Sequence, residues 1–279
     1  MDLPTSLPFE QLDAALLASN SLIVHQCFFF LNGQQPPYPA LPSMFQPYRD
    51  TWLQQNPLWT HIIWTPQTSL ALVTNYYPQY LSLYNSFPLP IERSDFMRLC
   101  ALHRYGGIYA DMDTSCRKSM TELRSRFSQP IGLSNDPIHR VANCFMLSQS
   151  ARHPLWLRLM DCAQRSFSVD PSASVLQTTG PAMMNRLLYE ELTPVELAEV
   201  MVYDTSVVLW DGSSRLLHPS RIFSDAEAAY VVHHNNYSWK KGKLISVYRR
   251  ATRFGILLPF IVLLLILFLV TTLFKARQC

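Results

Sequence analysis

The chain has 279 residues, 48% of them hydrophobic, which is enough to bury a full core in one large domain. Eight of the 23 Lys and Arg residues lie between Lys240 and Arg277, where there is no Asp or Glu, so the chain before Lys240 has 15 basic residues against 20 acidic ones. A mildly acidic body argues against a nucleic-acid-binding surface.

Apolar runs and turn residues predict alternating strands and helices in the body of the chain. In chain order, the expected elements are a strand at 21–30, a helix at 48–55, a strand at 60–65, a helix at 91–105, a strand at 108–113, a helix at 153–167 and a strand at 202–210. Strands that alternate with helices are typical of an α/β sheet with helices on both of its faces.

Residues 255–274 form a twenty-residue stretch without a charge, and basic residues lie on both sides of it. At ~1.5 Å of rise per residue, such a helix crosses a hydrocarbon core of ~30 Å. The alternative, a buried core helix, fits less well because such helices rarely lack every polar break. The sequence therefore predicts a single C-terminal transmembrane helix.

An acidic motif, Asp111-Met112-Asp113, ends the strand expected at 108–113. Alternation along a strand would place Tyr109, Asp111 and Asp113 on one face. Two neighbouring carboxylates repel each other unless a proton or a cation compensates them, and Mg²⁺ or Mn²⁺ commonly takes one or two carboxylates together with substrate phosphates. The pattern thus favours a metal site that binds a nucleotide diphosphate, although a solvated acidic turn would have the same spacing.

The helix expected at 91–105 has two charged residues on an otherwise apolar face. Asp95 and Arg98 lie three residues apart, so they are neighbours on that face. Buried charges need partners, which a structural ion pair would supply. Because Gly106-Gly107 ends the helix directly before the acidic strand, this face could also be directed toward the same pocket.

These residues belong to a segment, RSDFMRLCALHRYGGIYADMD at 93–113, that resembles the sugar-binding, DXD-containing region of family 32 glycosyltransferases. That family includes yeast-type α-mannosyltransferases and mannosyl inositol phosphorylceramide synthases. The resemblance continues in order from about Leu22 to Trp239, through the segments Ile23–Gln26, Tyr48–Thr65, Asn143–Trp156, Thr179–Pro181 and His233–Trp239.

The uncharged stretch and the basic residues around it predict a basic juxtamembrane linker over 244–254, the transmembrane helix over 255–274 and a short basic tail over 275–279. The resemblance predicts a GT-A (Rossmann-like) nucleotide-sugar transferase domain over residues 1–243. It also implies transfer with retention of anomeric configuration, and Mn²⁺ or Mg²⁺ as the cofactor.

The resemblance further implies a role for each matching residue. Asp111 and Asp113 are the expected catalytic residues: Asp111 binds ribose and sugar hydroxyls, and both are metal ligands. The other residues expected to bind the donor are Asp95, Arg98, Gly106, Gly107, Tyr109, Ser238 and Trp239. The pair His233 and His234 is expected to contribute to the metal site, and the sequence does not choose between the two.

The expected activity is transfer of a hexose, mannose from GDP-mannose, to a membrane lipid such as inositol phosphorylceramide. A UDP-sugar used on a glycan, protein or small-molecule acceptor is the alternative, and a tail-anchored lectin or adaptor without catalysis is a second one. A metal-dependent phosphohydrolase or nucleotidyltransferase is disfavoured because the sequence shows no second carboxylate cluster for a two-metal site.

The expected location is a Golgi or ER membrane, crossed once. Six basic residues before the predicted span and two after it favour a cytosolic catalytic domain by the positive-inside rule. The resemblance implies a catalytic domain in the lumen instead, so the sequence does not decide on which side of the membrane the domain lies.

A chain that ends near Lys243 tests the single-anchor prediction. We expect it to be soluble and to hydrolyse donor slowly, because the recognisable segments end by Trp239. Activity on a membrane acceptor should fall, since tethering raises the local concentration of enzyme at the bilayer. Carbonate extraction checks this: a truncated chain that stays in the membrane pellet contradicts a single anchor at 255–274.

Overall fold

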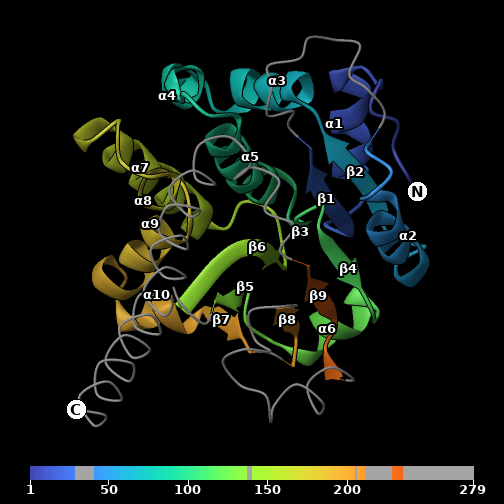
Figure 1. Ribbon diagram of the computed structural model, residues 1–279. Helices are drawn as coiled ribbons and strands as arrows, with labels where there is room; N and C mark the ends of the chain where they lie inside the picture. The colour runs from blue at the N-terminus through green and yellow to red at the C-terminus, as the bar shows by residue number, and fades with distance from the viewer. Residues whose placement is uncertain (29–40, 137–139, 205, 211–227, 235–279) are drawn as a thin grey trace, which may run out of the picture. The chain divides into compact units, whose positions relative to one another are not determined.

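The computed structural model describes residues 1–28, 41–136, 140–204, 206–210 and 228–234 (Figure 1). Its helices are α1 Phe9–Ala18, α2 Gln46–Gln55, α3 Pro66–Tyr76, α4 Leu81–Ser86, α5 Pro90–Tyr105, α6 Met120–Arg126, α7 Pro154–Val169, α8 Val175–Thr178, α9 Pro181–Arg186 and α10 Pro194–Ala198, with a 3₁₀ turn at Pro78–Tyr80 and a π-helical turn at Leu187–Glu191. Its strands are β1 Ile23–Cys27, β2 Thr60–Trp64, β3 Gly107–Ala110, β4 Thr114–Cys116, β5 Ile131–Asp136, β6 Arg140–Ser148, β7 Val200–Tyr203, β8 Val208–Trp210 and β9 Val231–His233.

The described strands form two sheets. The main sheet has the order β2-β1-β3-β6-β5-β7 and the small sheet has the order β4-β9-β8. In the main sheet β1 runs parallel to β2 and β3, and β6 runs antiparallel to β3 and β5. The fold is therefore α/β with a mixed main sheet, which confirms the predicted fold class at this level.

Each face of the main sheet packs against its own hydrophobic core. Ile23 on β1 and Met146 on β6 belong to a core that includes residues of α1, α3, α5 and α7. Val24 and Ile108 belong to the other core, which α2, α6 and all three strands of the small sheet cover (Figure 1). The prediction of helices on both faces is thus incomplete, because the small sheet takes part of the second face.

The predicted helices at 48–55, 91–105 and 153–167 correspond to α2, α5 and α7. Two predicted strands need correction. The strand expected at 108–113 ends at Ala110, and the segment expected as one strand at 202–210 is divided between β7 and β8, which belong to different sheets. The strands expected at 21–30 and 60–65 correspond to β1 and β2, with residues 29 and 30 outside the described part of the chain.

The junction of α5 and β3 requires glycine at two successive positions. Gly106 has φ +67° and Gly107 has φ +89°, in the left-handed region that side chains disfavour. A Cβ atom on Gly107 would lie 2.6 Å from the Ile23 carbonyl oxygen. His25 fixes the same junction, because Trp64 Nε1 donates to His25 Nδ1 at 3.2 Å, which leaves Nε2 to donate to the Gly106 carbonyl at 2.9 Å. Burial lowers the pKa of His25 to about 4, so this ring is neutral at physiological pH.

None of the helices that the structure describes is long and apolar enough to cross a membrane. The predicted span at 255–274, the linker at 244–254 and the tail at 275–279 lie outside the described residues.

Helix α1 is fastened to α3 and α5 through one carboxylate. Asp13 accepts hydrogen bonds from Tyr105 Oη at 2.6 Å and Tyr76 Oη at 2.7 Å, and it pairs with Arg104 at 3.2 Å. Although burial opposes it, hydrogen bonds from these three residues lower the pKa of Asp13 below its ordinary value.

Asp13→Asn should therefore lower stability near neutral pH by about 1–3 kcal/mol, because buried donors lose a charged acceptor. Because the pKa of Asp13 is lower in the folded state than in the unfolded state, its charge stabilises the fold above the unfolded-state pKa, and this stabilisation is lost as the pH falls. The difference in stability between Asp13→Asn and wild type should therefore shrink below about pH 4. Urea unfolding at pH 7 and pH 3.5 measures this, with Asp50→Asn as the control, since Asp50 accepts from the exposed amide of Gln46. An equal loss at both pH values would contradict it.

Candidate functional site

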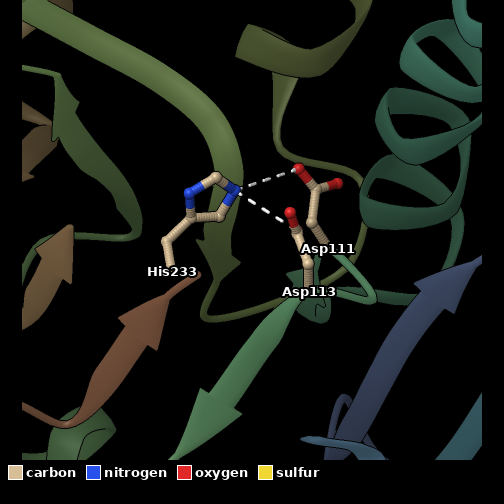
Figure 2. A group of neighbouring side chains, drawn as sticks. All are labelled: Asp111, Asp113 and His233. Atoms are coloured by element: carbon tan, nitrogen blue, oxygen red, sulfur yellow. Dashed lines mark ion pairs between the residues drawn. The ribbon is translucent and has the colours of Figure 1, made fainter. Parts of the chain in front are cut away.

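Two neighbouring aspartates, Asp111 and Asp113, meet the distant His233 where the two sheets join (Figure 2). His233 Nε2 lies 3.3 Å from Asp113 Oδ1 and 3.9 Å from Asp111 Oδ2. Each residue offers one ligand atom, and these atoms lie within 4.8 Å of one another. The ligand atoms are close enough together for a single metal ion to bind all three residues.

A turn, not a strand, brings the two aspartates together. Asp111 follows β3 and its backbone N donates to the Cys144 carbonyl of β6 at 2.8 Å, while Thr114 N closes the turn onto the Asp111 carbonyl at 3.1 Å. Asp113 directly precedes β4, whose Thr114 pairs with His233 of β9. The turn thus links the main sheet to the small sheet, and the register of β4 and β9 sets His233 beside the carboxylates.

The surroundings of Asp111 disfavour an isolated negative charge. Burial raises its pKa and the nearby Asp113 adds to that, whereas Arg98, His233 and Tyr109 oppose it. The Asp111 side chain is still 28% exposed and that of Asp113 16% exposed, so both can be reached from solvent. Two carboxylate oxygens and one imidazole nitrogen are ligands that Mn²⁺ and similar divalent ions accept, and such an ion would offset the repulsion.

Arg98 on α5 bridges two carboxylates while itself only 2% exposed. Its Nη1 lies 3.2 Å from Asp111 Oδ1 and its Nη2 lies 2.8 Å from Asp95 Oδ1. Nη1 also donates to the Asn143 carbonyl at 2.7 Å, and the guanidinium lies 4.3 Å from the centre of the Tyr109 ring. Tyr109 Oη in turn donates to Asp111 Oδ1 at 2.8 Å. The arginine is therefore held in one orientation by partners on every side.

Asp95 completes this network from within α5. Burial raises its pKa to about 7, opposed by Arg98 and by hydrogen bonds from Thr179 and Asn143. Asn143 Nδ2 donates to Asp95 Oδ1 at 3.0 Å and Thr179 Oγ1 donates to Oδ2 at 3.1 Å. Neither Asn143 nor Thr179 is among the site residues expected from the sequence, although each begins one of the segments that carry the resemblance.

The structure thus brings together Asp95, Arg98, Tyr109, Asp111, Asp113 and His233. Between the two histidines it sets His233 beside the carboxylates, whereas His234 Nε2 lies 2.9 Å from Ser115 Oγ and its ring stacks on Tyr48 at 4.3 Å.

The other residues expected to bind the donor are not found at this cluster. Gly106 and Gly107 lie at the opposite end of β3, where they permit the turn from α5. Ser238 and Trp239 fall outside the described residues.

Comparison with known proteins finds a family whose match includes the α5 and DXD-turn residues of this network. The family described as "Glycosyltransferase sugar-binding region containing DXD motif" matches residues 42–131. That range includes Asp95 and Arg98 on α5 and both aspartates of the turn.

Curated relatives extend the match. The chain is 25% identical over 217 residues to mannosyl phosphorylinositol ceramide synthase CSH1 of Saccharomyces cerevisiae, covering 72% of this chain and 50% of the relative. It is 26% identical over 152 residues to inositol phosphoceramide mannosyltransferase 3 of Schizosaccharomyces pombe, covering 52% and 40%. The uncharacterized glycosyltransferase L373 of Acanthamoeba polyphaga mimivirus is 23% identical, covering 77% and 82%. The match spans about half the length of CSH1 and less than half the length of inositol phosphoceramide mannosyltransferase 3.

Solved structures show a more distant likeness. The PaToxG glycosyltransferase has a TM-score of 0.48 and 16% identity, covering 66% of this chain and 75% of that one. The galactosyltransferase LgtC with donor and acceptor sugar analogs has a TM-score of 0.46 and 11% identity, covering 77% and 88%. At these scores the likeness carries no argument about the site.

The family match includes Asp95, Arg98, Tyr109, Asp111 and Asp113 of the residues that the fold gathers, and the curated relatives agree with the resemblance deduced from the sequence. Over residues 42–131, the chain is similar to the glycosyltransferases with a DXD-containing sugar-binding region.

Proposed function

We propose that this chain is a metal-dependent, retaining hexosyltransferase with a GT-A fold, which transfers mannose from GDP-mannose to a membrane lipid such as inositol phosphorylceramide. The observation that carries the proposal is the joining of Asp111, Asp113 and His233 to the buried Arg98 bridge. A cation ligand set beside a fixed guanidinium suits a substrate that contains both a diphosphate and a polar sugar.

The cluster of Asp111, Asp113 and His233 would hold the divalent cation, Mn²⁺ or Mg²⁺. The ion would supply positive charge that binds the diphosphate and stabilises it as the leaving group. Backbone pairing between β4 and β9 joins the segment that carries Asp113 to the strand that carries His233. The backbones of both residues would therefore be held in place before any substrate binds.

Arg98, Asp95 and Tyr109 would shape the part of the site that binds the sugar. Arg98 remains charged and cannot turn away, because its nitrogens are shared among two carboxylates and a carbonyl. Asp111, with Oδ1 accepting from Tyr109, keeps Oδ2 on the side of His233. Donors that are already oriented need no reorganisation when charge develops, which is the main electrostatic contribution expected of such a site.

The choice of donor and acceptor is supported by the relatives and by the sequence outside the described residues. Several curated relatives are named as transferring mannose to inositol phosphoceramide. The predicted span at 255–274 would hold the domain at a Golgi or ER membrane, and the basic residues between 240 and 253 would attract an anionic surface by roughly 1 kcal/mol each. An acceptor head group in the bilayer would then be within reach.

Asp113→Asn tests the metal role. The substitution keeps the shape of the side chain and removes its charge, so turnover of donor should fall by about 100-fold or more while the melting temperature changes little. His233→Gln should also weaken Mn²⁺ binding measured by electron paramagnetic resonance, and His234→Gln should weaken it far less. Wild-type turnover that survives excess chelator, or an active Asp113→Asn variant, would rule out the metal role.

A panel of radiolabelled nucleotide sugars tests the substrates. Purified full-length protein is incubated with Mn²⁺, membrane lipid extract and either GDP-mannose, UDP-galactose or UDP-N-acetylglucosamine. We expect label to enter lipid from GDP-mannose. Label that enters lipid only from a UDP-sugar would overturn the donor assignment, and label that never enters lipid or water-soluble product would favour a binding protein without catalysis.

A further inference from the structure

Two consecutive threonines hold two buried carboxylates of α5. Thr178 Oγ1 donates to Glu92 Oε1 at 2.9 Å, and Thr179 Oγ1 donates to Asp95 Oδ2 at 3.1 Å. Glu92 and Asp95 lie three residues apart, so they are neighbours on the face of α5 that the end of α8 covers. Thr178 is fully buried and Thr179 is 2% exposed, so neither hydroxyl has ready access to water.

The two contacts differ in what lies beyond the carboxylate. Glu92 Oε2 accepts from Leu89 N at 3.2 Å, which caps the start of α5. Asp95, one turn further along, pairs with Arg98, which reaches Asp111. The Thr178 contact therefore secures a helix end, whereas the Thr179 contact is connected to the candidate site.

Thr179 holds the Asp95 oxygen that the rest of the network does not hold. Arg98 Nη2 forms an ion pair with Oδ1 and Asn143 Nδ2 donates to the same oxygen, while Thr179 Oγ1 donates to Oδ2. A carboxylate held at both oxygens has a fixed plane, and one held at a single oxygen can rotate about the bond to its Cβ. Rotation of Asp95 would displace its contact with Arg98 Nη2, and because the guanidinium is planar, Nη1 would move relative to Asp111.

The main chain around Thr179 makes this hydroxyl a fixed support. Thr179 N and Gly180 N both donate to the Val175 carbonyl, at 3.1 and 2.8 Å, and α9 begins at Pro181. A Cβ atom on Gly180 would lie 3.0 Å from the Val175 carbonyl oxygen, so the turn is closely packed. The hydroxyl is thus presented by a segment that has little room to move.

We propose that Thr179 is a positioning residue for the donor sugar: through Asp95 and Arg98 it sets the orientation of Asp111, whose partly exposed carboxylate would contact the sugar. The proposal rests on the proposed function, because it assumes that the sugar binds beside Asp111. Thr178, with the same chemistry one residue away, has a purely structural role.

The matched variants are Thr179→Val and Thr178→Val, each of which replaces a hydroxyl with a methyl group of similar shape. Donor binding is measured by calorimetry and donor hydrolysis by steady-state kinetics, on full-length protein with Mn²⁺ and the nucleotide sugar that wild type uses best. Thr179→Val should raise the donor KM and dissociation constant and lower kcat/KM about tenfold, while Thr178→Val should leave the donor KM within about twofold of wild type. Both variants should lose thermal stability, since each leaves a buried carboxylate oxygen without its donor.

Two further variants separate positioning from folding. Thr179→Ser keeps the hydroxyl and should restore donor affinity to within about threefold of wild type even if stability stays low. In an Asp95→Asn background, Thr179→Val should add little further loss of donor affinity, because the two residues act through one contact.

Equal donor constants for Thr179→Val and Thr178→Val, no rescue by Thr179→Ser, or additive losses in the Asp95→Asn background would each overturn the role of Thr179. A folded wild type that neither binds nor hydrolyses any nucleotide sugar would instead overturn the proposed function, and this inference with it.

Discussion

The arrangement of the candidate site depends on the positive charge of Arg98, which lies almost wholly inside the protein. A guanidinium in such surroundings must be paired and hydrogen-bonded, or its transfer from water would cost several kcal/mol. Asp95 and Asp111 supply the charges, the Asn143 carbonyl an acceptor and Tyr109 an aromatic face. These groups belong to α5, β3, β6 and the turn after β3. The contacts that Arg98 makes with them therefore hold these four segments in place relative to one another.

A second constraint is the change of sheet that follows Asp111. The chain leaves the main sheet at Ala110, turns over three residues and enters the small sheet at Thr114. Because β4 pairs with β9, His233 returns to the same turn, although it lies 119 positions after Thr114 in the sequence. The carboxylates thus receive one electrostatic partner from the main sheet side, Arg98, and another from the small sheet side, His233.

The sequence could predict what depends on local pattern. The helix at 91–105 has apolar periodicity and a glycine stop, and α5 ends at Tyr105 as expected. The pairing of Asp95 with Arg98 follows from helical spacing, and the DXD motif with its surroundings indicated the resemblance that the family match at residues 42–131 supports. The face of Tyr109 was also predictable, since alternation holds through Ala110.

What could not be predicted depends on contacts between distant segments. Strand alternation continued through Asp113 in the prediction, because nothing local shows that Asp111 N bonds to β6 while Thr114 enters another sheet. The choice of His233 over His234 follows from the register of β9 with β4. The roles of Asn143 and Thr179 become visible only when their segments lie against α5. Gly106 and Gly107 are near the motif in sequence but lie at the opposite end of β3 from the two aspartates.

The central claim is that Asp111, Asp113 and His233 form a divalent cation site that adjoins the Arg98 bridge. The most direct measurement is an anomalous difference map at the manganese edge from crystals grown with Mn²⁺ and a nucleoside diphosphate. We expect a manganese peak within bonding distance of Asp111, Asp113 and His233, with the diphosphate bound at the ion. A manganese peak elsewhere, or a nucleotide bound away from this turn with the three side chains unliganded, would contradict it.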